Sequence, residues 1–308
     1  MTKTHKLTRR RFIQGVGLAA STSWLAASKS AVAQVAPPSE PVSHKIMSCN
    51  IRVPVEADAK AGNGWEHRKA MCSEIILSHR PDVICLQECR GVQFEYLKDR
   101  WSAFEHHGLS DPGPVFEPFN AIFYSRSRYA LISAGGFWLS QTPHVAGTRS
   151  WDSRNVRFVN WVDLKTRDSN KIFRVWNTHL DHRGQVGREN QARLIVEASM
   201  PLAADLPQIL TGDMNSKPSN PAIQCFKDGG WTSTYDTAHG VGADTGNTFH
   251  GFQGPKYAED SPDKRVDGQI DWIFYRGKVK VLTADVIRDG RDGRYPSDHY
   301  FMSAEVVL

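Results

Sequence analysis

The sequence predicts an α/β fold in which two stacked, mostly antiparallel β-sheets are flanked by helices, as a four-layer α/β/β/α sandwich. Segments with the apolar pattern of strands outnumber segments with helical periodicity, and the helical segments fall between the strands. No Pro- or Ser-rich linker interrupts residues 44–308, so we expect this range to fold as one domain. With 308 residues and 40% hydrophobic content, the chain can bury a full core.

Residues 1–34 have the features of a transport signal and not of a folded segment. A twin-arginine pattern at 8–13 is followed by an apolar stretch at 13–27, rich in Gly and Ala, and by the cleavage site Ala31-Val32-Ala33. An Arg-rich disordered tail would leave the apolar stretch and the cleavage site unexplained. We therefore expect a twin-arginine signal peptide at 1–34, which directs the protein to the periplasm or out of the cell, and a disordered leader at 35–43.

The basic charge of the whole chain comes from this signal. Residues 1–34 hold six of the 38 Lys and Arg side chains and none of the 33 Asp and Glu side chains. The expected mature chain is therefore close to neutral, and it lacks the broad excess of cations that general nucleic-acid binding requires. No later apolar run is long enough to span a bilayer, so we expect no stable membrane insertion; we also expect a monomer.

The cysteines indicate free thiols. Their spacing is not that of zinc ligands, and an odd number cannot pair completely within one chain. A twin-arginine substrate folds before export in a reducing compartment, so we expect buried thiols and no disulfide. The five residues are Cys49, Cys72, Cys85, Cys89 and Cys225.

Strand patterns occur along the whole domain. The segment at 44–53 alternates, whereas the segment at 82–86 is continuously apolar, as in a strand buried on both faces. In chain order, strands are expected at 44–53, 82–86, 120–125, 129–139, 157–165, 171–180, 208–210, 269–275, 278–287 and 300–308.

Helical spacing and loop composition account for the rest. Pro81 stops the first helix, and Pro201 breaks or ends the third. Residues 232–267 are rich in Gly, Asp and Pro, so we expect long surface loops there. Helices are expected at 65–79, 92–101, 186–206 and 221–227.

The stretch after the strand at 208–210 carries the strongest single signal for chemistry. Gly212 allows the chain to turn sharply, so that the carboxylate of Asp213 and the amide of Asn215 emerge together at the end of the strand. Strand ends are where open sheets keep their active sites. Such an oxygen-rich pair suits a hard cation or the positioning of a water, although an Asx-rich turn is often only a turn.

Five further strands carry polar residues at or near their ends. Each residue alone has an ordinary structural explanation: an Asn caps or turns, a Glu is solvated, and a His forms a surface hydrogen bond. Together and in this order they are not a background pattern. With Asp213 and Asn215, the set comprises Asn50, Glu88, His179, Asp271, Asp298 and His299.

These segments resemble the endonuclease/exonuclease/phosphatase superfamily, which has the fold of pancreatic deoxyribonuclease. The resemblance covers about residues 44–308, and further features at 136–140 and 180–184 are similar to a bacterial secreted branch. The matching motifs are Ser48-Cys49-Asn50-Ile51-Arg52, Asp82-Val83-Ile84-Cys85-Leu86-Gln87-Glu88, Asn177-Thr178-His179-Leu180-Asp181-His182, Thr211-Gly212-Asp213-Met214-Asn215, Gln269-Ile270-Asp271-Trp272-Ile273 and Pro296-Ser297-Asp298-His299.

The resemblance implies a metal site. Glu88 would hold a divalent cation, helped by Asn50 and Asp298. Because the ligands are carboxylate and amide oxygens with no thiolate, Mg²⁺ is the expected ion, and Mn²⁺ would also fit.

The resemblance also implies catalytic roles. Asp213 and Asn215 would position the attacking water and a phosphoryl oxygen, and His179 would donate to the phosphate. His299 would act as acid or base, with Asp271 accepting its second N–H. Whether Asp213 or His299 takes the proton of the water stays open.

One position departs from the family pattern. Relatives often carry a Gly-Glu pair before the strand at 119–124, and that Glu orients the histidine that matches His179. Here Pro118 occupies the aligned position, with Glu117 beside it. Either Glu117 substitutes after a small shift or His179 is oriented in another way.

Four further residues are weaker candidates for binding substrate. Arg154 and Arg157 could offer a guanidinium to a phosphate, although exposed arginines are common. Asp181 and His182 directly follow His179 and could line the same pocket.

These features predict an exported, metal-dependent hydrolase of phosphomonoesters or phosphodiesters. Because the mature chain is close to neutral, we expect a phosphorylated small molecule, a lipid head group or a glycan as the substrate rather than nucleic acid. Two alternatives remain. An extracytoplasmic nuclease would need Lys and Arg gathered on one rim of the site, and a noncatalytic binding protein would use the fold only as a scaffold.

Overall fold

The structure is a computed structural model that describes residues 42–110, 119–259 and 268–308. The predicted signal peptide at 1–34, nearly all of the predicted leader and Glu117 with Pro118 lie outside the described residues. Pro41–Leu308 forms one compact unit.

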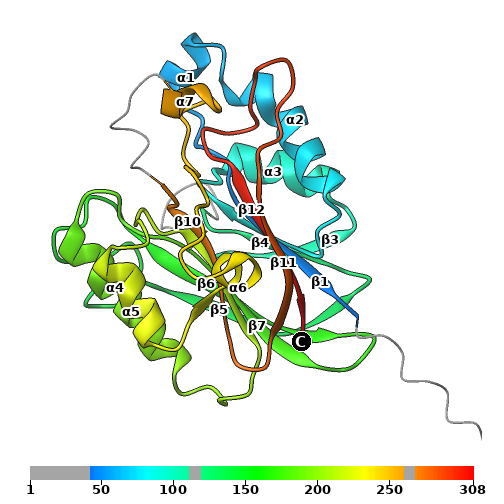
Figure 1. Ribbon diagram of the computed structural model, residues 1–308, viewed down its shortest axis with the longest axis vertical. Helices are drawn as coiled ribbons and strands as arrows, with labels where there is room; N and C mark the ends of the chain where they lie inside the picture. The colour runs from blue at the N-terminus through cyan, green and yellow to red at the C-terminus, as the bar shows by residue number, and fades with distance from the viewer. Residues whose placement is uncertain (1–41, 111–118, 260–267) are drawn as a thin grey trace, which may run out of the picture. The chain divides into compact units, whose positions relative to one another are not determined.

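Two mixed six-stranded sheets form the centre of this unit, as predicted (Figure 1). Among the described strands, β1 pairs in parallel with β2 and β7 with β8, and the other pairs are antiparallel. The first sheet has the order β11 (Lys280–Ile287), β12 (Phe301–Val307), β1 (His44–Asn50), β2 (Val83–Gln87), β4 (Ile122–Ser125), β3 (Phe104–His107). The second has the order β5 (Tyr129–Trp138), β6 (Phe158–Thr166), β7 (Ile172–His179), β8 (Gln208–Asp213), β10 (Asp271–Arg276), β9 (Thr232–Ser233).

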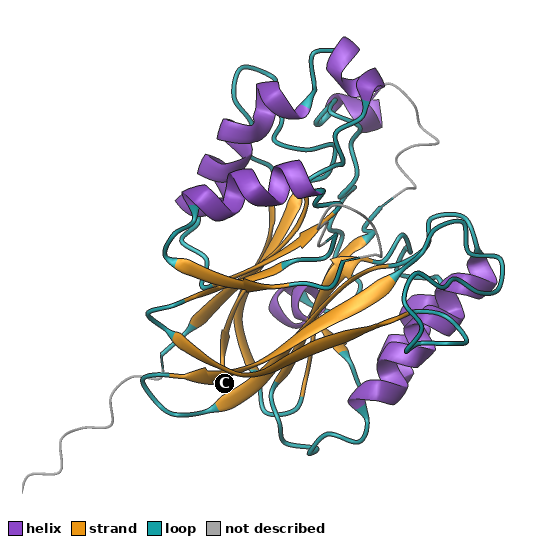
Figure 2. Ribbon diagram, turned by 180° about the vertical axis from the view of Figure 1, so that it is seen from behind, coloured by secondary structure: helices purple, strands orange, loops and turns teal. Residues whose placement is uncertain are grey.

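Helices cover the outer face of each sheet and complete the four layers (Figure 2). Helices α2 (Trp65–Ser78) and α3 (Gly91–Arg100) pack on the first sheet, and α4 (Gln185–Ser199) and α5 (Pro221–Asp228) pack on the second. The short helices are α1 (Glu56–Lys60), α6 (Thr234–His239) and α7 (Lys256–Glu259).

Strand alternation divides the core into three apolar layers. In β2, Val83 and Cys85 face the second sheet, whereas Ile84 and Leu86 face α2 and α3, because successive side chains of a strand point to opposite faces. A third layer joins the second sheet to α4 and α5. Each fully buried aliphatic side chain contributes about 1.5–3 kcal/mol of burial free energy.

The cysteines are free thiols, and four of the five are buried, as predicted. Burial raises the pKa of the Cys72 thiol to about 12, so this side chain stays protonated and apolar at neutral pH.

Several predicted boundaries were wrong. The third predicted helix, α4, ends at Ser199, close to the predicted break at Pro201 and short of 206, and the expected loops at 232–267 contain β9, α6 and α7. The sequence patterns also missed β3 and α1, which are short and not regularly apolar.

Gly212 does not make the predicted turn. It lies inside β8, which continues to Asp213 and pairs Gly212 with Thr178 and Trp272. A Cβ atom at this position would overlap the carbonyl oxygen of Thr178, so glycine allows β7 and β8 to approach closely. The turn comes later, at Asn215, which has a left-handed backbone (φ 46°).

The topology brings the polar strand ends to one edge of the sandwich. Parallel β7 and β8 place His179 beside Asp213, and antiparallel β10 begins with Asp271 opposite Asp213. In the first sheet, parallel β1 and β2 end together at Asn50 and Gln87. Strand β12 runs antiparallel to β1, so the residues before it, which include His299, reach the same edge.

Candidate active site

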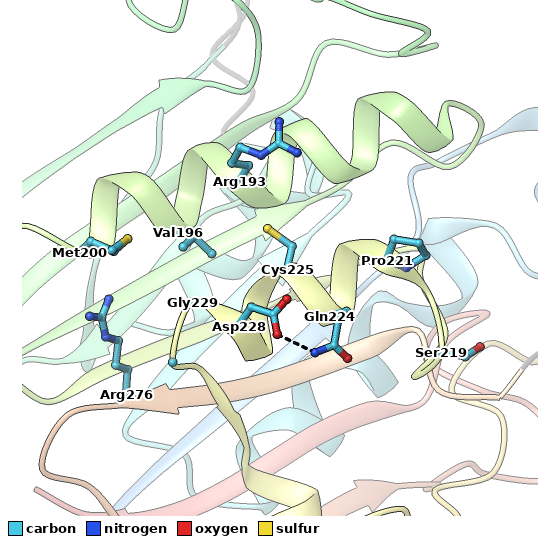
Figure 3. Close-up of a pocket in the computed structure, with 11 residues that line it drawn as sticks. Arg193, Val196, Met200, Ser219, Pro221, Gln224, Cys225, Asp228, Gly229 and Arg276 are labelled. Atoms are coloured by element: carbon cyan, nitrogen blue, oxygen red, sulfur yellow. Dashed lines mark hydrogen bonds between the residues drawn. The ribbon is translucent and has the colours of Figure 1, made fainter.

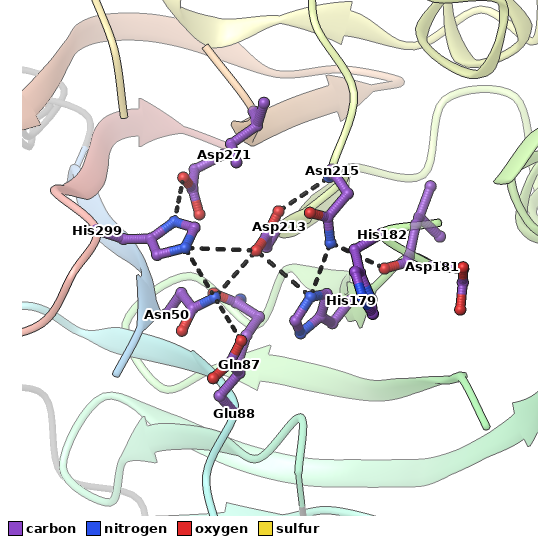
Figure 4. A network of polar contacts seen from close by, with 12 residues as sticks. Asn50, Gln87, Glu88, His179, Asp181, His182, Asp213, Asn215, Asp271 and His299 are labelled. Carbon is purple, nitrogen blue, oxygen red and sulfur yellow. Dashed lines mark hydrogen bonds and ion pairs between the residues drawn. The ribbon is translucent and has the colours of Figure 1, made fainter. Parts of the chain in front are cut away.

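A pocket of about 420 Å³ opens at this edge, and the predicted strand-end residues gather in it (Figure 4). Asn50 and Asp271 lie behind its wall and hydrogen-bond to residues that line it. The lining comprises Arg52, Val53, Glu88, Phe119, Asn155, Arg157, His179, His182, Asp213, Asn215, Phe249, Ile270, Asp298 and His299.

The Asp213 carboxylate is the centre of the polar network. Its Oδ2 accepts a hydrogen bond from Asn50 Nδ2 (2.9 Å), and its Oδ1 accepts one from the backbone N–H of Asn215 (2.9 Å). The same Oδ2 lies 3.4 Å from His179 Nε2 and 3.8 Å from His299 Nε2. The carboxylate is buried, so its position is fixed by these partners rather than by solvent.

His299 and Asp271 form the predicted pair. His299 Nδ1 lies 2.9 Å from Asp271 Oδ2, so Asp271 accepts a hydrogen bond from Nδ1–H. The other ring nitrogen, Nε2, faces the pocket. The ring of Phe249 packs edge-on against His299, with centroids 5.1 Å apart, and holds the imidazole plane from the side.

Burial and neighbouring carboxylates raise the pKa of Asp213 together, whereas they oppose each other at His299. Burial raises the pKa of Asp213 to about 7, and the negative charges of Asp271 and Glu88 add to the rise. Burial alone would lower the pKa of His299, but the carboxylates of Asp271, Asp213 and Asp298 together raise it to about 10. At neutral pH the network therefore pairs the protonated imidazole of His299 with the carboxylate of Asp213, which titrates near neutral pH.

The Nε2 atom of His179 meets two N–H donors, while Glu117, which could orient this ring, lies outside the described residues. Its Nε2 faces Asn215 Nδ2 (2.9 Å) and Arg157 Nη2 (3.2 Å), and Asn215 Nδ2 also donates to the carbonyl of Leu180 (3.1 Å). The two shorter contacts are with N–H donors, which favours Nε2 as their acceptor over donation to Asp213 Oδ2 at 3.4 Å, and the imidazole is then neutral. Burial, followed by the charge of Arg157, lowers the pKa of His179 well below its ordinary value. The predicted donation from His179 to a phosphate would need Nε2 to carry the proton instead, and it stays a prediction.

Glu88 and Asp298 in the wall, with Asn50 behind it, offer oxygen atoms that could hold a cation. Glu88 has a left-handed backbone (φ 59°), which costs about 1 kcal/mol for a residue with a Cβ and is typical of functional sites. Its Oε2 accepts the N–H of Val53 (2.9 Å), and Asn50 Nδ2 lies 3.4 Å from its Oε1. Burial raises the pKa of Asp298, and Glu88 adds to the rise.

Asn50 presents its nitrogen to the network. Its Oδ1 accepts the N–H of Arg52 (3.0 Å), which orients the amide so that Nδ2 points toward Asp213 and Glu88. In this orientation Asn50 positions the two carboxylates, and it would reach a cation only through the second lone pair of its oxygen.

A second arrangement of ligand atoms is present. Asp213, Asp271 and His299 each offer an atom within 4.8 Å of the others. A cation bound by all three would compete with the hydrogen bond between His299 and Asp271. A cation at the predicted ligands Glu88 and Asp298 would leave that bond intact.

Buried amides join the two sheets beneath the pocket. Gln87 Nε2 donates to Asn177 Oδ1 (2.7 Å), and Asn177 Nδ2 donates to the carbonyl of Leu86 (2.7 Å). Thr211 Oγ1 also donates to Asn177 Oδ1 (3.1 Å). These bonds fix the separation of the sheets directly below the site and hold Glu88, which follows Gln87, at its depth.

The weaker candidates divide into two groups. Arg157, which is buried, and His182 line the pocket as predicted. Arg154 does not; it is exposed and lines a neighbouring hollow.

Asp181 is not available to a substrate, contrary to the expectation. It is fully buried, and its carboxylate accepts the backbone N–H groups of Asn155, Arg183 and Gly184, each at 2.8 Å. Burial alone would raise its pKa, but these three donors lower it further than burial raises it. Its role is to fix the loops at the pocket edge.

Some lining residues carried no signal in the sequence. Phe249 lies in a region with the composition of a loop, and Asn155 follows an exposed turn. Only the pairing of Phe249 with His299 through an isolated bridge brings that ring to the pocket. Arg52 belongs to the motif around Asn50, and its Nε contacts Asp58 and Asp298 at 2.8 and 3.5 Å.

A larger hollow of about 930 Å³ lies over α4 and α5 (Figure 3). It contains none of the strand-end residues, and the side chains around it include Arg193, Met200, Cys225 and Arg276. Its Asp228 already bonds Gln224 (2.7 Å). The polar network of the smaller pocket therefore identifies the candidate active site.

The fold and this pocket define a DNase I-like α/β sandwich with an acid–imidazole site between its two sheets. The chain belongs to the Endonuclease/Exonuclease/phosphatase family, whose model matches residues 47–299.

Individual relatives agree with this membership. A family protein from Bacteroides thetaiotaomicron is 27% identical, with a TM-score of 0.77 over 87% of this chain and 99% of that one. A mannosyl-6-phosphatase from the same organism is 26% identical, with a TM-score of 0.75 over 86% of this chain and 100% of that one. Nocturnin of Drosophila melanogaster is 30% identical over 51% of this chain and 25% of its own length.

The chain spans only part of the curated relatives that it matches, since the alignments cover from 25% to 58% of the length of the first four. Among the described helices, none combines the length and the apolar content needed to cross a bilayer.

Proposed function

We propose that this protein is an exported, divalent-metal-dependent hydrolase of phosphate esters, in which a water attacks phosphorus in line with the leaving oxygen. The observation that supports this best is the buried carboxylate of Asp213, held by Asn50 and Asn215 and facing His299. Family membership is consistent with phosphate-ester hydrolysis.

The residues present fit a divalent cation. Glu88 and Asp298 would hold it, with Asn50 beside them, and the raised pKa values of Asp213 and Asp298 reflect burial together with crowded negative charge that a cation would relieve. The all-oxygen donor set favours Mg²⁺, with Mn²⁺ as the other fitting ion. When bound, such an ion supplies positive charge that stabilises the phosphoryl oxygens in the transition state.

The chain's own groups handle the proton and the phosphoryl charge. Asp213, whose pKa is raised to about 7, orients the attacking water and accepts its proton. His299 is protonated, and its Nε2–H donates to a phosphoryl oxygen while Asp271 holds Nδ1. Protonated His299 cannot act as the base, so these shifts favour Asp213 for that role.

The part of the pocket lined by Arg157 and His179 binds the phosphate group. Arg157 is buried at the pocket with its Nη2 beside His179, and it offers a guanidinium to the non-bridging oxygens. His179 is a positioning residue, because its acceptor Nε2 orients both Arg157 and the amide of Asn215.

The substrate we propose is a phosphorylated small molecule, lipid head group or glycan. The similar mannosyl-6-phosphatase supports a phosphorylated sugar among these. The mature chain is close to neutral, which disfavours a general nuclease. A noncatalytic scaffold is disfavoured because His299 lies within 2.9 Å of Asp271 and within 3.8 Å of Asp213, as an acid–base site requires.

Turnover assays test the proposal. The purified protein would be given sugar 6-phosphates, glycerophosphodiesters, and p-nitrophenyl phosphomonoesters and phosphodiesters. Each substrate would be tested with Mg²⁺, with Mn²⁺ and with EDTA. We expect turnover that requires the metal and is lost in Asp213→Ala and His299→Ala. Metal-independent turnover, or none on any ester, would contradict the proposal.

Export is tested separately. The full chain, tagged at its C-terminus, should reach the periplasm in a cell with a working twin-arginine system, and Arg10→Lys with Arg11→Lys should leave it in the cytoplasm. Equal export of both forms would remove the assignment.

A further inference from the structure

A second, arginine-rich hollow of about 510 Å³ opens beside the catalytic pocket. Its residues come from two loops, one that precedes β6 and one that joins β7 to α4. Three of the five lining side chains are cationic and one is acidic: Arg149, Asp152, Ser153, Arg154 and Arg183.

The acidic member is already engaged. Asp152 Oδ1 accepts the N–H of Gly187 (2.6 Å), and Oδ2 accepts that of Val186 (3.3 Å), in the first turn of α4. Its charge therefore serves the start of this helix. It forms no ion pair with the arginines of the hollow.

The three guanidiniums have no carboxylate partner among the described residues. Arg149 Nη1 donates to the carbonyl of Arg154 (2.6 Å), and Arg183 Nε donates to His182 Nε2 (3.4 Å); both acceptors are uncharged. All three side chains are exposed and have N–H groups left to donate. A planar guanidinium of this kind matches the oxygens of a phosphate.

The two loops are held together in advance. Asp181 links them, because one oxygen accepts the N–H of Asn155 and the other accepts those of Arg183 and Gly184. Gly184 packs so closely on Asp152 that a Cβ atom would overlap it. A ligand would therefore meet an arrangement that needs little reorganisation.

The hollow shares a wall with the catalytic pocket. Asn155 and His182 line that pocket, and they are the chain neighbours of Arg154 and Arg183. Asn155 Nδ2 lies 3.3 Å from His182 Nδ1, so the two side chains form one partition (Figure 4 shows His182 beside Asp181). Adjacent residues of the same two loops therefore line both spaces.

We propose that this hollow binds a second anionic group of the substrate while the ester to be hydrolysed occupies the catalytic pocket. The inference rests on the proposed function and narrows its substrate class to small molecules that carry a phosphate ester and another acidic group, foremost a second phosphate. Three arginines gathered in one small hollow suit a single extra anion. A polynucleotide would need cations spaced along a groove.

Matched substrate pairs test this. The pairs are fructose 6-phosphate with fructose 1,6-bisphosphate, and glycerol 2-phosphate with 2-phosphoglycerate, which separate a second phosphate from a carboxylate. We expect kcat/KM to be about ten- to a hundredfold higher for the doubly charged member of at least one pair, because a charge-assisted contact is worth that factor.

Variants connect the preference to the hollow. Arg154→Ala with Arg183→Ala should bring the ratio of kcat/KM within the preferred pair close to one, and the matching Lys variants should keep part of it because the charge remains. Arg193→Ala is the control: this arginine is also exposed, lies on α4, bonds Asn190 and lines the other hollow (Figure 3). Its ratio should equal that of the unaltered protein.

Three outcomes would overturn the inference. The ratio could survive the double Ala variant, Arg193→Ala could lower it equally, or a dinucleotide phosphodiester could be preferred over both pairs.

Direct binding separates this inference from the proposed function. If no ester is hydrolysed, the proposed function fails, and calorimetry with inorganic pyrophosphate on the metal-free protein still tests the hollow. We expect pyrophosphate to bind about tenfold or more weakly to the double Ala variant, and more weakly at high salt. Equal binding by the variant and the unaltered protein would overturn the inference.

Discussion

Replacement of Asp271 by Asn isolates the electrostatic part of the candidate site. The change keeps the shape of the side chain that faces His299 Nδ1 at 2.9 Å but removes its negative charge. Two unit charges about 4 Å apart attract by about 4 kcal/mol at an effective dielectric constant of 20, and one pKa unit corresponds to about 1.4 kcal/mol. The pKa of His299 should therefore fall by about 3, from about 10 to near the ordinary value of 6.5.

The loss should appear in two measurements. In the metal-free protein, the ring NMR signals of His299 should titrate near pH 7 in Asp271→Asn and near pH 10 in the unaltered protein. With metal and the best substrate, turnover at neutral pH should fall by about twofold or more, because only about half of the His299 imidazoles keep their proton when the pKa lies near 7.

Asp163→Asn is the matched control. Asp163 also forms a short ion pair, with Arg174 at 2.6 Å, but β6 and β7 carry that pair away from the pocket. This variant should leave the His299 titration and the turnover unchanged. If His299 still titrates near pH 10 in Asp271→Asn, or if the control shifts it equally, the electrostatic account of the pair is wrong.

Three further predictions concern the packing of β7 against β8, the stability of the fold in acid and the binding of the metal. Gly212→Ala should destabilise the fold by about 1–3 kcal/mol in urea unfolding, because its Cβ would overlap Thr178; an unchanged midpoint would refute this close packing. Burial lowers the pKa of His250 to about 3 from 6.5, so the unfolded chain binds a proton first as pH falls, and stability is lost below about pH 6.5. At pH 5 the loss in the free energy of unfolding is about 2 kcal/mol. The variant His250→Asn can still accept the N–H of Gly254, and calorimetry should show that it loses less stability between pH 7 and pH 5 than the unaltered protein does. Glu88→Gln should weaken Mg²⁺ binding by about 100-fold or more. Equal Mg²⁺ affinity of the variant and the unaltered protein would mean that other residues bind the ion.

Local patterns were sufficient to place most strands and helices. The alternation of Ile46 and Met47 between two apolar layers follows from the period of a strand, which depends on neighbours in the chain and not on distant contacts. Short elements with weak patterns were missed: β3 is held by its pairing with β4, and α6 has only six residues.

Motif order also placed the candidate site at the edge where strands end. It could not assign the state of each atom. The orientation of the Asn50 amide depends on Asp213, which is 163 positions away, and the acceptor role of His179 Nε2 depends on Arg157 and Asn215. Such contacts join distant segments, so no local window of sequence contains them.

Two binding candidates show the same limit. Arg154 and Asp181 stand next to pocket residues in the chain, yet one faces a separate hollow and the other is buried against backbone N–H groups. Proximity in sequence placed them near the site, and the path of the loops determined which way each side chain points.

The sequence by itself therefore determined the layers of the sandwich and the polar strand ends, because apolar periodicity and strand termini are local properties of the chain. Only the tertiary structure decided which nitrogen of His179 accepts, which carboxylates share a charge and which arginines meet in the second hollow. Those properties arise from burial and from electrostatic contacts between segments far apart in sequence, and these exist only once both sheets have packed.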